Sequence, residues 1–231
     1  MEPQKLSLLQ EKIGYQFHEE KLLKQAVTHS SYANEQKIRR LANYERVEFL
    51  GDAVLELVSS EFFYHQYPDL PEGKLTKMRA SAVCEQALAI TARQLQIGSF
   101  MLFGKGEEAT GGRDRDSIIA DAVEAVIGAI YLDGGFEEAA KFIHKFVLND
   151  LENKKLFYDA KSILQEEVQN NKLGVLSYEL IKEEGPEHDK AFYVAALLNG
   201  EQIGTGVGHN KKAAEQNAAY EAILARQKNR E

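Results

Sequence analysis

The chain has 231 residues, of which 44% are hydrophobic and 28% charged, as in an ordinary globular protein with room for two domains. Its single cysteine, Cys84, excludes a disulfide framework and favours a reducing compartment. The net charge of −8 excludes a chain that is basic throughout, so a nucleic-acid site would have to be a local patch of Lys and Arg.

Helices joined by loops are expected over the first 150 residues. Residues 1–20 contain no apolar segment typical of a signal peptide, and no apolar run in the chain reaches the length of a membrane span. We therefore expect a cytoplasmic protein with no membrane partner. Hydrophobic periodicity, together with the positions of Gly and Pro, predicts helices over 44–67, 74–95, 117–135 and 136–152, with a loop rich in glycine and charge over 104–116.

The pattern changes after a short polar segment. Three strands are predicted in the sequences LSYELIKEE, AFYVAALL and EQIGTGVG, and Asn199-Gly200 between the last two is a strong hairpin signal. Helices are predicted before and after them. The fold class is therefore predicted as an all-α N-terminal domain followed by a small α+β domain in the order α-β-β-β-α. We place the first domain over residues 1–153, the linker over 154–159 and the second domain over 160–231.

Three carboxylates share one face of the helix predicted over 44–67. Because each residue of a helix advances by about 100°, Glu45, Glu48 and Asp52 fall within about 60° of arc. The helix predicted to follow Ser117 is apolar almost all round, as is typical of a buried helix. Between Ser117 and Asp133, it carries only the charges of Asp121 and Glu124, which also share a face.

Burying carboxylates without a partner costs several kcal/mol. The simplest compensating charge is a divalent metal, and oxygen ligands favour Mg²⁺ or Mn²⁺ over Zn²⁺. An acidic pair on a helix is more often simply solvated, and that alternative stays open; Glu56, on the same stripe, is taken as solvent-facing or structural. A di-iron site needs Glu-x-x-His pairs, which the chain lacks, whereas metal-assisted phosphodiester hydrolysis fits an all-carboxylate site.

Four blocks of the sequence resemble those of the ribonuclease III family. They are THSSY, NYERVEFLGDAVLE, PEGKLTKMRA and DSIIADAVEAVIGAIYLDGG, in that order along the chain. Val47 and Val123 depart from the family pattern, which has Leu and Phe there. These departures alter packing and leave every acidic residue in place.

The resemblance implies a helical, homodimeric endonuclease domain and Mg²⁺-dependent cleavage of both strands of double-stranded RNA, with Mn²⁺ able to substitute. It implies 5′-phosphate and 3′-hydroxyl ends and roles in ribosomal RNA processing and in mRNA processing and decay. Carried over by position, the residues fall into three groups. The metal-site acids are Glu48, Asp52, Asp121 and Glu124, of which Asp52 and Glu124 are expected to be catalytic. The cleft acids are Glu45 and Glu72, the latter serving the partner subunit, and Phe49 would fill a socket on the partner.

A basic patch is predicted at the start of the last helix. Asn210 is expected to be its N-cap, which places Lys211 and Lys212 in the first turn, where they oppose the helix dipole. A bound phosphate would compensate, because helix N-termini bind anions. Two solvated lysines are the alternative. The domains that residues 160–226 resemble often carry a third basic residue at the position of Glu215.

Residues 160–226 resemble a double-stranded RNA-binding domain. The resemblance implies that side chains on its first helix reach one minor groove and that a loop histidine reaches the next. These residues are Ser162, Gln165, Gln169 and His188. Two other interpretations remain: a non-catalytic double-stranded RNA-binding protein with the same fold, and a hydrolase of small phosphorylated molecules, which would leave the second domain unexplained.

Overall fold

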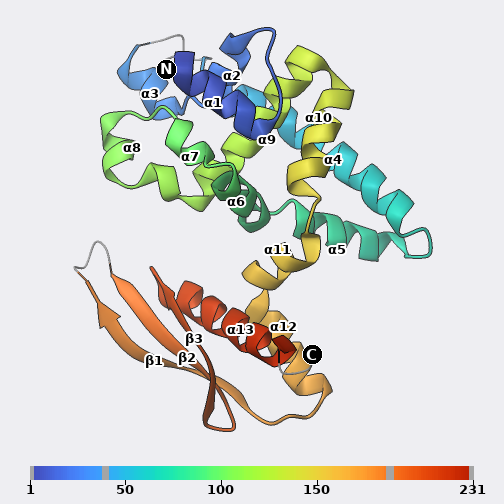
Figure 1. Cartoon of the computed structure of the whole chain (residues 1–231), viewed down its shortest axis with the longest axis vertical. Helices are drawn as coiled ribbons and strands as arrows, with labels where there is room; N and C mark the ends of the chain where they lie inside the picture. Colours follow the sequence, from blue (N-terminus) through green and yellow to red (C-terminus); the bar gives the residue numbers. More distant parts are fainter. Residues whose placement is uncertain (1–2, 38–41, 186–189, 229–231) are drawn as a thin grey trace. The chain divides into compact units, whose positions relative to one another are not determined.

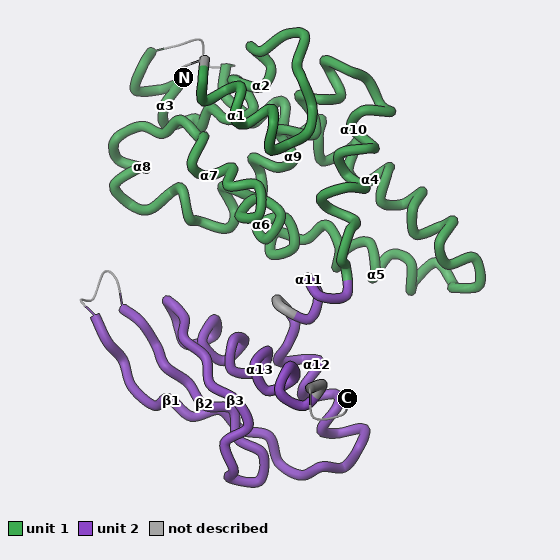
Figure 2. The backbone as a smooth tube through the Cα atoms, in the orientation of Figure 1, with its two compact units in different colours: residues 1–151 green, residues 152–231 purple. Residues whose placement is uncertain are grey.

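A computed structural model describes residues 3–37, 42–185 and 190–228 (Figure 1). The chain divides into two compact units, Met1–Leu151 and Glu152–Glu231 (Figure 2). The first is helical and the second combines helices with a three-stranded sheet, which confirms the predicted fold class. None of the helices in the described parts of the chain combines the length and the apolar character needed to cross a bilayer.

The first unit is built from ten α-helices among its described residues. Apart from an isolated bridge between Thr28 and Leu102, those residues form no β-structure. The helices are α1 (Pro3–Ile13), α2 (Glu20–Ala26), α3 (Ser30–Glu35), α4 (Glu45–Gln66), α5 (Glu72–Ala82), α6 (Glu85–Gln94), α7 (Ile97–Phe100), α8 (Lys105–Ala109), α9 (Asp116–Gly134) and α10 (Phe136–Phe142).

Helix α9 is the centre of this unit, as its apolar sequence predicted. Most of its side chains from Ile118 to Ile130 are buried. It packs against α4 through two glycines. A Cβ atom at Gly51 of α4 would lie 1.8 Å from the Glu124 carbonyl oxygen, and one at Gly128 of α9 would lie 2.1 Å from the Val47 carbonyl oxygen. Only glycine therefore permits this close approach of the two backbones.

Two of the helix predictions were wrong in their extent. The helix expected over 74–95 is broken between α5 and α6, because Cys84 has the extended backbone of a helix N-cap. The helix expected over 136–152 ends after α10 and a π-helical segment, Ile143–Val147, and the break follows from the left-handed backbone of Asp150 at φ 52°.

Helix α11 (Leu151–Tyr158) covers most of the segment expected to be a polar linker. Its residues 154–158 are therefore helical. The boundary between the two domains within this segment remains a proposal.

The second unit contains α12 (Ala160–Asn170), β1 (Leu176–Glu184), β2 (Ala191–Leu198), β3 (Glu201–Gly208) and α13 (Lys211–Lys228). The antiparallel sheet has the order β1-β2-β3. Asn199 and Gly200 both have positive φ values, at 53° and 84°, as the predicted two-residue hairpin requires. Helix α13 lies directly on β3, because Gly206 leaves no Cβ between the strand and the backbone of α13.

Candidate active site

The close crossing of α4 and α9 brings the two predicted acidic pairs together. Glu48 and Asp52 lie on either side of Gly51, the residue whose backbone touches Glu124 of α9. Burial, and after it the negative charges of neighbouring acids such as Asp52 and Glu48, together raise the pKa of Glu124 to about 8. The four carboxylates are therefore close enough to repel one another.

The same repulsion acts on two other members of the cluster. Burial raises the pKa of Glu48, and the charges of Asp121, Asp52 and Glu45 add to that rise. Burial also raises the pKa of Asp121, although the hydrogen bond from Tyr44 and the proximity of His29 act in the opposite direction. Carboxylates that repel one another in this way favour the binding of a cation or a proton.

Two aromatic residues next to the acids were missed by the sequence interpretation. The Tyr44 hydroxyl donates a hydrogen bond to Asp121 Oδ2 at 3.3 Å. The Tyr44 ring stacks on His29, with 5.6 Å between ring centroids, and the pKa of its hydroxyl is raised by burial and then by Asp121. His29 also contacts Phe103, and burial lowers its pKa. Both residues lie within motifs already singled out, NYERVEFLGD and THSSY, but their contact is tertiary.

The donor chemistry of this cluster fits a divalent cation. Four carboxylates from two helices supply the oxygen ligands that Mg²⁺ and Mn²⁺ prefer. Within the described parts of the chain, however, no three Asp, Glu, His or Cys side chains converge closely enough to share one ion as they stand. The acids would therefore have to rotate toward the ion.

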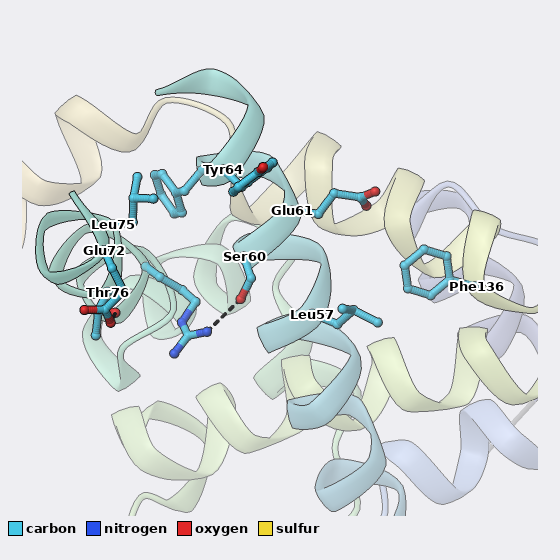
Figure 3. Close-up of a pocket in the computed structure, with 10 residues that line it drawn as sticks. Leu57, Ser60, Glu61, Tyr64, Glu72, Leu75, Thr76 and Phe136 are labelled. Carbon is cyan, nitrogen blue, oxygen red and sulfur yellow. Dashed lines mark hydrogen bonds between the residues drawn. The ribbon is translucent and has the colours of Figure 1, made fainter. Parts of the chain in front are cut away.

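The remaining predicted acids lie outside this cluster. Glu45 is exposed in the first turn of α4. Glu56 forms an ion pair of 2.9 Å with Arg79 of α5 and is structural. Glu72 begins α5, accepts a hydrogen bond of 2.8 Å from Thr76, and lines an open pocket of about 600 Å³ between α4, α5 and Phe136 (Figure 3). Its place within this subunit is therefore different from that of the α4 and α9 acids.

Phe49 projects from the surface of α4. It is 77% exposed, so it does not pack in the core of its own subunit. Leu57 and Tyr64 of the same helix are also exposed, at 59% and 68%, and both line the pocket of Figure 3. One face of α4 thus carries large apolar side chains in water.

The predicted RNA-binding residues lie on the surface of the second unit. Ser162, Gln165 and Gln169 are exposed on α12. Asn210 is the N-cap of α13, as predicted, because its Oδ1 accepts a hydrogen bond of 2.8 Å from the Ala213 amide. His188 lies outside the described residues.

The charges around α13 are partly balanced within the unit. Lys211 and Lys212 are exposed in its first turn, and Lys211 Nζ lies 3.8 Å from Glu183 of β1. Glu215 pairs with Lys161 of α12. The acidic residue at the position where a third basic side chain was expected is therefore neutralised by a neighbouring lysine.

Comparisons with known families match both units. A family described as "Ribonuclease-III-like" matches residues 19–151, and the "Double-stranded RNA binding motif" matches residues 160–225. Two similar curated proteins are both named Ribonuclease 3. That of Anoxybacillus flavithermus is 49% identical over 221 residues, covering 95% of this chain and 93% of the relative. That of Enterococcus faecalis is 47% identical over 225 residues, covering 96% and 98%.

A solved structure resembles the first unit. It is the nuclease domain of ribonuclease III from Campylobacter jejuni, with a TM-score of 0.58 and 40% sequence identity. The similarity covers 62% of this chain and 95% of that domain. The Campylobacter domain is described as flexible in a region involved in dimer formation.

Proposed function

Since this chain belongs to the ribonuclease III family, whose members are endonucleases of double-stranded RNA, we propose that it cleaves such RNA by Mg²⁺-dependent hydrolysis. Mn²⁺ is expected to substitute, and the products are expected to carry 5′-phosphate and 3′-hydroxyl ends. The observation that supports this proposal most directly is the crossing of α4 and α9 at Gly51 and Gly128, which brings carboxylates from two helices close enough to repel one another.

The acids of the two helices have distinct roles in this proposal. Asp52 and Glu124 are the essential pair, because a metal held between helices needs a ligand from each. Glu48 and Asp121 complete the donor set, Glu45 lies beside it, and Glu72 is assigned to the cleft of the partner subunit. A bound divalent ion would lower the pKa of attacking water and stabilise charge on the phosphate.

The test is single-turnover cleavage of a defined RNA hairpin across a Mg²⁺ titration, with binding followed separately in Ca²⁺. Asp52→Asn and Glu124→Gln should each lower the cleavage rate by orders of magnitude, because metal activation of water supplies several kcal/mol of the barrier reduction. Hairpin binding should persist. Glu61→Gln, an exposed acid on α4 outside the cluster, is the matched control and should cut normally.

The same experiment separates the alternatives. A non-catalytic RNA-binding protein would bind the hairpin but cut nothing with or without Mg²⁺. A hydrolase of small phosphorylated molecules would leave the duplex intact and act on a small phosphodiester instead. If Asp52→Asn and Glu124→Gln both cut near the wild-type rate, these acids are structural and the proposed metal site is wrong.

We also propose that the first unit forms a homodimer in which Phe49 enters the partner subunit. The exposed ring of Phe49 and the exposed Leu57 and Tyr64 on the same helix support this surface. Sedimentation at micromolar concentration should show a dimer that Phe49→Ala weakens. Leu8→Ala, at a leucine of α1 that is 47% exposed, is the control on another helix. A purely monomeric wild-type protein would refute the dimer, and normal dimerisation of Phe49→Ala would refute the role of Phe49.

For the second unit, we propose that Lys211 and Lys212 bind RNA phosphate at the N-terminus of α13. Ser162, Gln165, Gln169 and His188 would contact the minor grooves, and Asn210 would hold the helix start. Lys211→Ala and Lys212→Ala should each reduce the slope of log affinity against log salt by about one unit, for all duplex sequences alike. Lys182→Ala, which removes the same charge from β1, should leave the slope unchanged. An unchanged slope for Lys211→Ala or Lys212→Ala would contradict the phosphate contact of that residue.

We assign this activity to the cytoplasm and to ribosomal RNA processing and mRNA processing and decay. The single cysteine supports a reducing compartment. Mapping of 5′-phosphate RNA ends in cells with and without the protein would test the assignment. Unchanged ends in ribosomal RNA precursors and in mRNAs would contradict it.

A further inference from the structure

We infer that Tyr44 is a positioning residue that orients Asp121 for the metal site. This inference rests on the proposed function. Tyr44 is 6% exposed and lies at the residue before α4, where its backbone and its side chain contact different segments. Its position links the start of α4 to the middle of α9.

The backbone of Tyr44 is fixed from two directions. Its amide donates a hydrogen bond of 2.9 Å to the Thr28 carbonyl. Its own carbonyl accepts hydrogen bonds from the amides of Val47 and Glu48, at 2.9 and 2.8 Å. The backbone of Tyr44 is therefore held both to Thr28 and to the first turn of α4, which carries Glu48.

The ring of Tyr44 is fixed as well. It stacks on the buried His29 at an interplanar angle of 27°, and His29 packs in turn against Phe103. The imidazole is itself held by Ser31, whose amide and hydroxyl both lie within hydrogen-bonding distance of Nδ1. A phenol with so little freedom places its hydroxyl at one defined point.

That point is Asp121 Oδ2, which accepts the hydroxyl at 3.3 Å. Among the hydrogen bonds of the described residues, this is the one that a side chain donates to Asp121. Because phenol is neutral, it orients one carboxylate oxygen without cancelling the charge, and it leaves Oδ1 available for an ion. Neighbours of this kind around metal ligands typically change metal affinity by 10- to 100-fold when they are removed.

The structure also contains a matched control. Tyr15 donates its hydroxyl to Asp133 Oδ2 at 2.9 Å, at the far end of the same helix α9. Tyr44→Phe and Tyr15→Phe therefore remove the same group from the same kind of contact. Only Tyr44→Phe removes it beside the acid cluster, and in both variants the ring remains.

The experiment measures Mn²⁺ binding to the metal-free full-length protein by electron paramagnetic resonance, without RNA. Tyr44→Phe should weaken Mn²⁺ binding about 10-fold, and Tyr15→Phe should bind like the wild type. In single-turnover cleavage, Tyr44→Phe should need about 10-fold more Mg²⁺ for half its maximal rate and approach the wild-type rate at saturation. Hairpin binding in Ca²⁺ should be unchanged.

A double-mutant cycle tests whether Tyr44 acts through Asp121. In an Asp121→Asn background, adding Tyr44→Phe should cause no further loss of Mn²⁺ affinity. Wild-type Mn²⁺ affinity in Tyr44→Phe, equal losses in the Tyr44 and Tyr15 variants, or additive losses in the cycle would each overturn the inference. A wild-type protein that neither binds Mn²⁺ nor cuts RNA would instead overturn the proposed function.

Discussion

Helix α9 carries carboxylates in two contrasting environments. The side chain of Asp133, near its end, is 1% exposed. Burial alone would raise the pKa of Asp133, but hydrogen bonds from the amides of His18 and Glu19 at 2.8 Å and from the Tyr15 hydroxyl at 2.9 Å lower it below its usual range. The carboxylate of Asp133 thus accepts several hydrogen bonds, and those from His18 and Glu19 connect α9 to the start of α2.

Glu124, in the middle of the same helix, is treated in the opposite way. Burial and four neighbouring carboxylates raise its pKa to about 8. The chain thus provides hydrogen bonds to the buried charge of Asp133 and leaves the repulsion around Glu124 uncompensated. Strongly shifted pKa values of this second kind are common at functional sites, which agrees with the proposed role of Glu124.

The largest expected effect tests whether the close crossing of α4 and α9 causes this repulsion. Gly51→Ala would place a Cβ atom 1.8 Å from the Glu124 carbonyl oxygen, so the two backbones must separate. We expect a loss of about 3 kcal/mol or more in the free energy of unfolding of the first unit, from overpacking at a backbone contact. The pKa of Glu124 should fall as its neighbours move away. Urea unfolding and NMR titration of the metal-free protein measure the two quantities.

Gly73→Ala is the matched control for this prediction. Gly73 lies in α5 with no atom within 4 Å of an added Cβ. Because alanine favours a helix more than glycine does, the change should leave stability equal or slightly higher. If Gly51→Ala behaves like Gly73→Ala, the close approach of α4 and α9 is not what gathers the acids.

Much of this arrangement could be predicted from local sequence. The buried character of α9 follows from its nearly unbroken apolar run, and the hairpin at Asn199-Gly200 follows from turn chemistry. The interruptions at Cys84 and Asp150 could not be predicted, because neither position carries the Gly or Pro that usually ends a helix. Their backbone conformations depend on how the flanking helices pack.

The site was predictable in a similar, partial way. The spacing of Glu48 with Asp52 and of Asp121 with Glu124 places each pair on one helix face. The contact between the pairs depends on Gly51 and Gly128, whose importance appears only once two helices are in place. Tyr44 and Asp121 are far apart in sequence, so no periodicity could connect them.

A smaller effect on the free energy of unfolding is expected from substitutions that compare the environments of Asp133 and Glu124 directly. Asp133→Asn replaces an acceptor of several hydrogen bonds by an amide that turns an NH₂ toward one of the donors. It should cost about 2 kcal/mol in the free energy of unfolding. Glu124→Gln keeps nearly the same size and removes a repelled charge, so in metal-free buffer at pH 8 it should leave stability unchanged or raise it. Urea unfolding measures both; equal losses would contradict the functional distinction between the two acids.

The smallest effect is the pH dependence of the Asp133 contribution. Its pKa is lower in the folded protein than its ordinary value of 3.8, so the folded state binds fewer protons than the unfolded state in this range. The stabilisation is therefore fully present above about pH 5 and is lost as the pH falls through the folded pKa, with a slope of at most about 1.4 kcal/mol per pH unit. The difference in unfolding free energy between the wild type and Asp133→Asn should accordingly shrink between pH 5 and pH 3. Tyr15→Phe removes one donor to this carboxylate and should reduce the same pH dependence without abolishing it. A difference that stays constant over this range would mean that Asp133 keeps the same proton affinity in both states, and that its hydrogen bonds do not stabilise its charge.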